Sequence, residues 1–264
     1  MGFTRKPLPS IAARPVPTAL TWADLVLDPA TRAEIDQIRA GMKQPRELRA
    51  GGKKTGYRVL FHGPSGTGKT LTAALLGKEL AVPVYRIDLS SLVSKYLGEA
   101  EKNLAAVLAE AESLDAILLL DEADALFGQR TAIADAHDRY ANQEISYLLQ
   151  RIEDYSGLVI LASNMRQNLD DAFIRRLQAV IEFPKPNAEQ RRQLWQNALG
   201  TKARVSADVD LAAIAQAHEL TGGQIETAAR LAALAAAQQP EKKVSLATII
   251  DSLRPEDRKP RRPE

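Results

Sequence analysis

The 264-residue sequence contains no cysteine, which excludes disulfide bonds and thiolate metal sites and fits a reducing compartment. Aromatic residues make up only 5% of the chain. The formal net charge is +2, which is too small to indicate a nucleic-acid-binding surface by itself. Long hydrophobic runs are also missing, since the strongest one, residues 116–120, is far too short to span a bilayer. Residues 1–6 lead into no apolar stretch of the kind that a signal peptide needs. We therefore expect a soluble, cytoplasmic protein without a membrane partner.

Prolines, glycines and charge divide the chain into four parts. Prolines at 7, 9, 15 and 17 predict an extended start, so that residues 1–50 form an N-terminal arm and linker with one short helical segment. Residues 51–185 alternate between strand-like and helix-like patterns, whereas residues 186–253 show helical patterns alone. The charged, proline-rich tail 254–264 is predicted to be disordered. Apolar residues, at 45% of the total, are enough for a substantial core.

The alternating part predicts a parallel sheet with helices on both faces. Strands are expected at 57–62, 84–88, 116–121, 157–163 and 179–183. Helices without strands follow Pro184 and Pro186, at 187–199, 208–219, 223–238 and 245–253. The predicted fold is a three-layer α/β domain followed by a small all-α domain.

Residues 63–70, Gly-Pro-Ser-Gly-Thr-Gly-Lys-Thr, match the phosphate-binding pattern G-x-x-x-x-G-K-[ST] in full. They follow a predicted strand and precede a predicted helix, so backbone N–H groups and the positive helix N-terminus can surround a polyphosphate. Lys69 can reach the β- and γ-phosphates, and the Thr70 hydroxyl can bind Mg²⁺. The predicted nucleotide contacts are Gly63, Pro64, Ser65, Gly66, Thr67, Gly68, Lys69, Thr70 and Leu71. The fold class is then that of a P-loop NTPase, with ATP and Mg²⁺ as cofactors.

Two adjacent acids end the most apolar predicted strand. The strand at 116–121 delivers Asp121 and Glu122 to the carboxyl edge of the sheet, beside the phosphate-binding loop. Asp121 is the expected Mg²⁺ partner, directly or through water, and Glu122 can accept a proton from an attacking water. Taken alone, the pair could be an acidic turn after an ordinary strand.

The order of these and later motifs resembles that of the AAA+ ATPases. The phosphate-binding loop, the acids at 121–124, a strand that ends at Ser163 and Asn164, and residues 169–176 (Leu-Asp-Asp-Ala-Phe-Ile-Arg-Arg) occur in that order. Within the family they resemble the AAA branch that includes katanin, spastin and the proteasomal ATPases, over residues 55–235. The core is most similar to stand-alone bacterial members, some of which accompany contractile injection systems.

The resemblance implies further site residues. Asn164 matches the sensor residue that orients the lytic water, and Arg175 or Arg176 matches the arginine finger that completes a neighbouring subunit's site. Gly222 and Gly223 match the lid turn near the adenine. The branch usually carries Gly-Arg-Phe after its first arginine, whereas residues 177–180 here are Leu-Gln-Ala-Val, so a second finger is not expected in that run. No arginine closely follows the lid turn, which predicts that a sensor-2 arginine is absent.

One segment resembles a pore loop of protein-remodelling members. It contains the residues Lys95, Tyr96, Leu97 and Gly98. An aromatic ring can grip any extended polypeptide through apolar contact, so Tyr96 is the predicted substrate contact, unless it packs in the core or against another subunit. Asp88 would couple substrate binding to Glu122. His137 and Asp138 have no third partner at a suitable spacing, so a metal site there is not expected.

We interpret the chain as a Mg²⁺-dependent ATPase that forms a homo-oligomeric ring, expected to be a hexamer, and remodels a protein substrate through a central pore. About 50 residues precede the first expected strand, so we expect the N-terminal arm, the pore or a separate adaptor to select the substrate. Two alternatives stay open: an ATP-dependent assembly switch without threading, and a nucleic-acid-associated ATPase such as a helicase loader. The second is the less favoured, because it needs a basic, salt-sensitive groove.

Overall fold

The computed structural model describes residues 13–43, 56–88, 99–123, 149–164, 171–200 and 205–253. The chain divides into two compact units. The first comprises Met1–Thr21, Ala30–Gly63 and Lys69–Glu182, and the second comprises Trp22–Pro29, Pro64–Gly68 and Phe183–Glu264. The phosphate-binding loop is divided between them, with Gly63, Lys69 and Thr70 in the first unit and residues 64–68 in the second.

The first unit is built on a sheet that has six strands in the described residues. The strands are β1 (Ala13–Pro15), β2 (Tyr57–His62), β3 (Val84–Asp88), β4 (Ile117–Asp121), β5 (Leu158–Ser163) and β6 (Ala179–Glu182). Their order is β1-β3-β4-β5-β2-β6, and all neighbours are parallel except β1 and β3. The three-layer α/β class is confirmed, with one antiparallel edge strand that the sequence did not predict.

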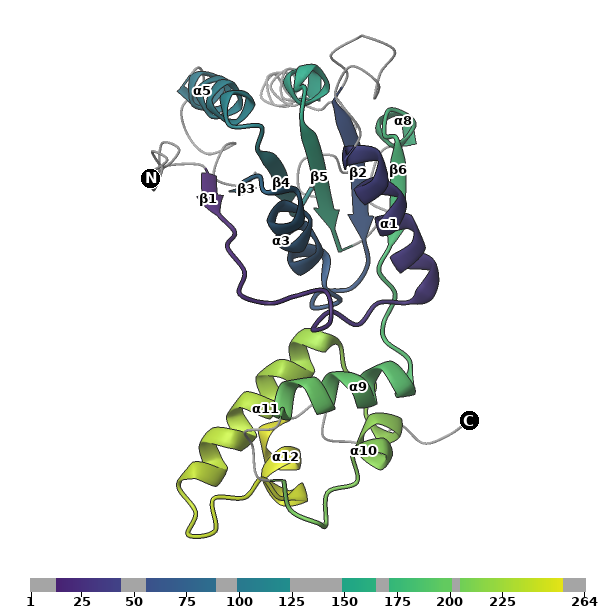
Figure 1. The fold of residues 1–264 in the computed structure, drawn as a ribbon, viewed down its shortest axis with the longest axis vertical. Coiled ribbons are helices and arrows are strands. Elements are labelled where there is room, and N and C mark those ends of the chain that lie inside the picture. Colours follow the sequence, from purple (N-terminus) through teal and green to yellow (C-terminus); the bar gives the residue numbers. More distant parts are fainter. Residues whose placement is uncertain are drawn as a thin grey trace, which may run out of the picture. The chain divides into compact units, whose positions relative to one another are not determined.

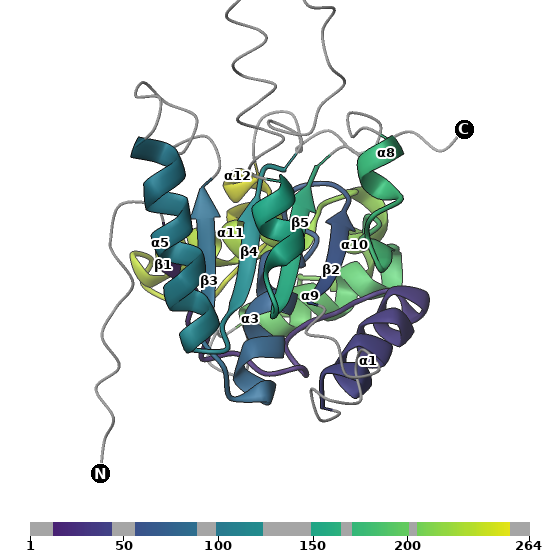
Figure 2. The same cartoon turned by 90° about the horizontal axis from the view of Figure 1, so that it is seen from above.

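One face of the sheet packs against α5 (Glu99–Ser113) and the helix that ends at Asp154. The core on this face joins apolar side chains of β2, β3, β4 and β5 with those of these helices, and it also includes Ala13 of β1 and Phe173. It contains Leu60, Tyr85, Ile87, Leu118, Leu120, Val159, Leu161, Val107, Leu108, Ala111 and Ile152. Figure 2 shows α5 running alongside β3. Successive residues of a strand point to opposite faces of the sheet, so the remaining side chains of each strand face the helices on the other side.

The opposite face is covered by α3 (Lys69–Leu80), which Figure 1 shows lying across β4. The helix α3 contacts β3 and β5 as well as β4. The packing is closest at Gly77, where an added Cβ atom would lie 2.2 Å from Val84 Cγ2. Glycine at this position lets the backbone of the helix lie directly against Val84 of β3, so the distance between α3 and the sheet is set by this contact. Since α3 begins at Lys69, this packing also fixes the start of the helix.

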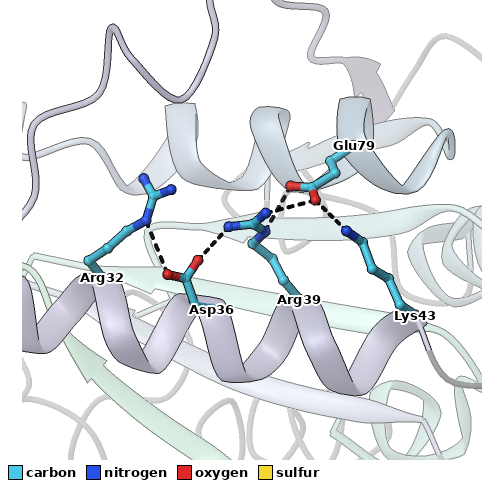
Figure 3. Close-up of polar contacts among 5 residues, drawn as sticks. All are labelled: Arg32, Asp36, Arg39, Lys43 and Glu79. Carbon is cyan, nitrogen blue, oxygen red and sulfur yellow. Dashed lines mark hydrogen bonds and ion pairs between the residues drawn. The ribbon is translucent and has the colours of Figure 1, made fainter.

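A cluster of charged side chains joins α1 (Pro29–Lys43) to the end of α3 (Figure 3). Glu79 on α3 accepts hydrogen bonds from Arg39 at 2.8 Å and from Lys43 at 2.6 Å. The hydrogen bond to Glu79 raises the pKa of Arg39, because it favours the charged guanidinium. Asp36 binds the same guanidinium and also Arg32. The contact ties α1 to the helix that starts with Lys69.

Arg58 is a buried cation on β2, with only 6% of its surface exposed. Its guanidinium donates to the carbonyl oxygens of Gly56, Ile152 and Tyr155. Burial lowers the pKa of Arg58, and the nearby Glu153 and Asp154 act in the opposite direction. Arg58 therefore satisfies carbonyls at the end of the helix that finishes at Asp154.

Arg58→Met is expected to destabilise the protein by about 2–4 kcal/mol, because several buried carbonyl oxygens would lose their donor. Arg58→Lys keeps the charge but has only one nitrogen, so we expect an intermediate loss. Urea unfolding followed by circular dichroism measures both, with the exposed Arg230→Met as the matched control. A loss for Arg58→Met no larger than that of the control would contradict this role.

The second unit has a helical core of its own. Its helices are α9 (Ala188–Leu199), α10 (Leu211–Ala217), α11 (Gly222–Ala237) and α12 (Leu246–Ser252). Their buried side chains surround Trp195, which is fully buried, together with Ile225 and Ile249. Asn187 and Gln190 form a reciprocal capping box that fixes the start of α9. None of the helices in the described part of the chain is both long and apolar enough to cross a membrane.

Candidate nucleotide-binding site

The phosphate-binding loop leaves β2 at His62 and enters α3 at Lys69. All three of its glycines have backbone angles that other residues rarely adopt, with φ of 142° at Gly63, 79° at Gly66 and 104° at Gly68. Space is restricted as well: an added Cβ atom would lie 2.7 Å from Thr221 Oγ1 at Gly66 and 2.8 Å from Leu25 Cδ1 at Gly68. Both positions therefore favour glycine for conformation, and at Gly66 the close approach of Thr221 and Gly223 adds a packing requirement.

Lys69 lies at the start of α3 with 7% of its surface exposed. Its Nζ donates to the Gly63 carbonyl oxygen at 2.5 Å and to Asn164 Oδ1 at 3.2 Å. Asn164 directly follows β5, which pairs with β2 along its whole length. The structure thus brings together the lysine and the asparagine that the sequence motifs singled out, from elements about 95 residues apart in the chain.

Asp121 and Glu122 stand at the carboxyl end of β4, at the same edge of the sheet. Asp121 Oδ1 accepts the Glu122 N–H at 3.1 Å, and Asp121 Oδ2 forms an ion pair with Arg86 on β3 at 3.0 Å. Glu122 is exposed and has a φ of 56°, a conformation that is uncommon outside glycine and costs about 1–3 kcal/mol. The chain turns sharply at this residue and carries its carboxylate out of the strand.

The donor set fits Mg²⁺. The predicted ligands are the Asp121 carboxylate and the Thr70 hydroxyl, and Mg²⁺ prefers oxygen donors. The guanidinium of Arg86 already stands as a cation beside Asp121 Oδ2, so this carboxylate can compensate positive charge. Among the described residues there is no group of three or more metal-binding side chains. Mg²⁺ at nucleotide sites is usually bound through one or two carboxylates together with substrate phosphates.

The lid-turn glycines lie beside the phosphate-binding loop within the second unit. The Gly223 N–H donates to the Gly66 carbonyl oxygen at 2.9 Å, and an added Cβ atom at Gly222 would lie 3.2 Å from that same oxygen. Thr221 caps the start of α11 in a reciprocal pair with Gln224. The start of α11 is therefore held against the loop by a backbone hydrogen bond and by close packing.

Arg175 and Arg176 lie on an exposed turn after α8 (Asp171–Ile174). Arg176 forms an ion pair with Glu153 at 2.6 Å, and no ion pair of Arg175 occurs within the described ranges. Gln178 fixes the turn to β2, since its N–H donates to the Arg58 carbonyl oxygen and its Oε1 accepts the Arg58 N–H.

Several predicted residues cannot be placed from this structure. Lys95, Tyr96, Leu97 and Gly98 lie outside the described residues, as do His137 and Asp138, and so does the side chain of Asp88. One residue of the site was not predicted at all. Arg86 had no motif to mark it, and its contact with Asp121 follows from the pairing of β3 with β4.

A strand, a glycine-rich loop with Lys69 and the start of a helix follow one another in the chain, and Asp121 and Asn164 end nearby parallel strands. Together they define a P-loop NTPase domain. Residues 59–185 match the profile of the family described as "ATPase family associated with various cellular activities (AAA)". This chain contains an AAA ATPase family domain.

Individual relatives agree with the family match. The chain is 32% identical over 203 residues to a proteasome-activating nucleotidase of Aeropyrum pernix, covering 73% of this chain and 49% of the relative. It is 30% identical over 225 residues to fidgetin-like protein 1 of Drosophila melanogaster, covering 82% and 42%. A cell division protein C of Sulfolobus acidocaldarius is 37% identical over 145 residues, covering 52% and 39%. The chain thus spans half or less of the length of these relatives.

Proposed function

We propose that this chain hydrolyses ATP with Mg²⁺ in a homo-oligomeric ring, expected to be a hexamer, and that hydrolysis remodels a protein substrate. The observation that supports hydrolysis most directly is the contact between Lys69 Nζ and Asn164 Oδ1, at the sheet edge where Asp121 and Glu122 also end. A lysine for phosphate, a carboxylate for metal and an amide for water are the groups that phosphoryl transfer needs.

Each residue has a proposed role. Lys69 binds the β- and γ-phosphates in place of its present contacts with Gly63 and Asn164, while Thr70 and Asp121 hold the metal. Bound Mg²⁺ would neutralise charge that develops on the phosphate oxygens. Glu122 accepts the proton of the attacking water, and Asn164 orients that water. The loop N–H groups contact phosphate oxygens, and the neighbouring lid turn contributes to nucleotide binding.

The site is proposed to be shared between subunits. An arginine from the adjacent subunit, Arg175 or Arg176, would stabilise the charge of the transition state, which is worth about 10³–10⁵ in kcat where it has been measured. An isolated subunit would then be nearly inactive. The proposed ring is cytoplasmic and engages neither membrane nor nucleic acid, and a separate adaptor could select its substrate.

Remodelling is favoured by the sequence around Tyr96 and by the similarity to a proteasome-activating nucleotidase. If substrate is pulled over Tyr96, an unfolded polypeptide such as reduced, alkylated lactalbumin should stimulate ATP turnover. Tyr96→Ala should abolish that stimulation while basal turnover and assembly persist, and Tyr96→Phe should keep it because the ring is retained. Equal stimulation in all three proteins would argue instead for an assembly switch that does not thread substrate.

A further inference from the structure

The ion pair between Arg86 and Asp121 links the second strand of the domain to the predicted metal ligand. Arg86 is paired in register with Leu119, two residues before Asp121, so the two charged side chains project from the same face of the sheet. This is the face covered by α3, because Val84, which α3 approaches at Gly77, has the same parity. The guanidinium reaches diagonally to Asp121 Oδ2 at 3.0 Å.

Both oxygens of Asp121 are engaged within the chain. Oδ1 accepts the Glu122 N–H, and Oδ2 faces the Arg86 guanidinium. A guanidinium carries a full positive charge at every relevant pH, so it offsets the charge of the carboxylate that would attract Mg²⁺. Each oxygen keeps a second lone pair, so the obstacle to a metal ion is the positive charge of Arg86 against Oδ2 rather than a lack of acceptor sites.

We propose that Arg86 is a positioning residue that holds Asp121 in the metal-free subunit, and that Mg²⁺ binding displaces it because two cations would otherwise share one carboxylate. This inference rests on the proposed function, since it takes Asp121 as the metal ligand. Displacement is feasible because 47% of the Arg86 side chain is exposed, so the guanidinium can turn into solvent. Arg86 thereby lowers the affinity of the subunit for the metal and keeps Asp121 oriented until the ion arrives.

The size of the effect follows from the exposure of the pair. A partly exposed ion pair is worth about 1 kcal/mol or less, which corresponds to a change in affinity of about fivefold at most, since about 1.4 kcal/mol is tenfold. Arg86→Gln is therefore expected to tighten metal binding by about twofold to fivefold. The difference should shrink as KCl is raised, because salt screens exposed charges.

Arg14 provides a matched control. It lies directly opposite Arg86 in the pairing of β1 with β3, so it has the same charge on the same face, one strand further from Asp121. Arg14→Gln changes the net charge by the same amount without removing a contact of Asp121. Arg86→Lys is the second control, since it keeps the charge and should keep a metal affinity near that of the wild type.

The experiment measures Mn²⁺ binding by the electron paramagnetic resonance signal of the free ion. The full chain is kept in excess over the non-hydrolysable nucleotide AMP-PNP, and nucleotide affinity is measured separately in EDTA. The inference predicts tighter Mn²⁺ binding for Arg86→Gln alone, with the thermal midpoint and the metal-free nucleotide affinity close to wild type.

Two results would overturn the inference while leaving the proposed function intact. One is an unchanged or weaker Mn²⁺ affinity in Arg86→Gln, and the other is an equal tightening in Arg14→Gln. If the wild-type chain bound neither AMP-PNP nor Mn²⁺, the proposed function itself would fail, and the inference with it.

Discussion

Glu122→Gln is expected to slow ATP hydrolysis by about 10²–10⁴-fold, because an amide cannot accept the proton of the attacking water. ATP binding should persist, since the proposed phosphate contacts come from Lys69 and the loop N–H groups. Phosphate release and binding of a fluorescent ATP analogue measure the two properties separately. The matched control is Glu226→Gln, an exposed glutamate on α11, which should behave as wild type.

The backbone at Glu122 allows a second test of the same role. Glycine adopts a φ of 56° without steric cost, so Glu122→Gly should change the free energy of unfolding by no more than about 1 kcal/mol. Hydrolysis should nevertheless fall as far as in Glu122→Gln, because the carboxylate is gone. Hydrolysis that survived in either variant would show that Glu122 is not the base.

Arg175→Ala is expected to reduce ATP turnover by about 10³–10⁵-fold in assembled rings, the range known for arginine fingers. Arg176→Ala should have a smaller effect, because Arg176 is engaged by Glu153 of its own subunit, whereas Arg175 has no ion pair within the described residues. The two losses are compared by measuring ATP turnover in samples in which the same fraction of each variant is assembled into rings. A larger loss for Arg176→Ala would reverse the assignment.

Mixing two inactive variants tests whether the finger acts between subunits. A Glu122→Gln subunit keeps Arg175, and an Arg175→Ala subunit keeps Glu122. In a randomly mixed ring of equal parts, about a quarter of the head-to-tail interfaces combine the two intact halves. Partial recovery of turnover is therefore expected on mixing. Complete absence of recovery in rings shown to contain both variants would argue for a site confined to one subunit.

Most of the sheet could be predicted because its strands are buried on both faces. Parallel strands of this kind appear as short apolar runs between helical patterns, and the five predicted strands agree with the structure to within one residue at each end. The strand β1 was missed, since three residues that end in Pro15 show neither alternation nor an apolar run. Its pairing depends on the exposed edge of β3, which no local pattern reveals.

Residues of the candidate site could be predicted where the topology of a parallel sheet determines their position. Lys69 and Asn164 meet because carboxyl ends of parallel strands share one edge of the sheet, where the phosphate-binding loop also begins. The contact of Arg86 with Asp121 depends instead on which strands are neighbours and in what register. Likewise, the resemblance placed the turn at Gly222 and Gly223 near the nucleotide, but no local pattern shows that Gly66 packs against Thr221. The pore-loop hypothesis for Tyr96 stays a prediction.

The most direct measurement is the rate of phosphate release per subunit as a function of protein concentration, for the wild type and for Glu122→Gln, with the mass of the ATP-bound protein followed in parallel. The account predicts that the wild-type rate rises steeply as rings form, and that Glu122→Gln forms ATP-bound rings without turnover. A wild-type monomer that hydrolysed ATP at its full rate at every concentration would contradict the shared site and the ring.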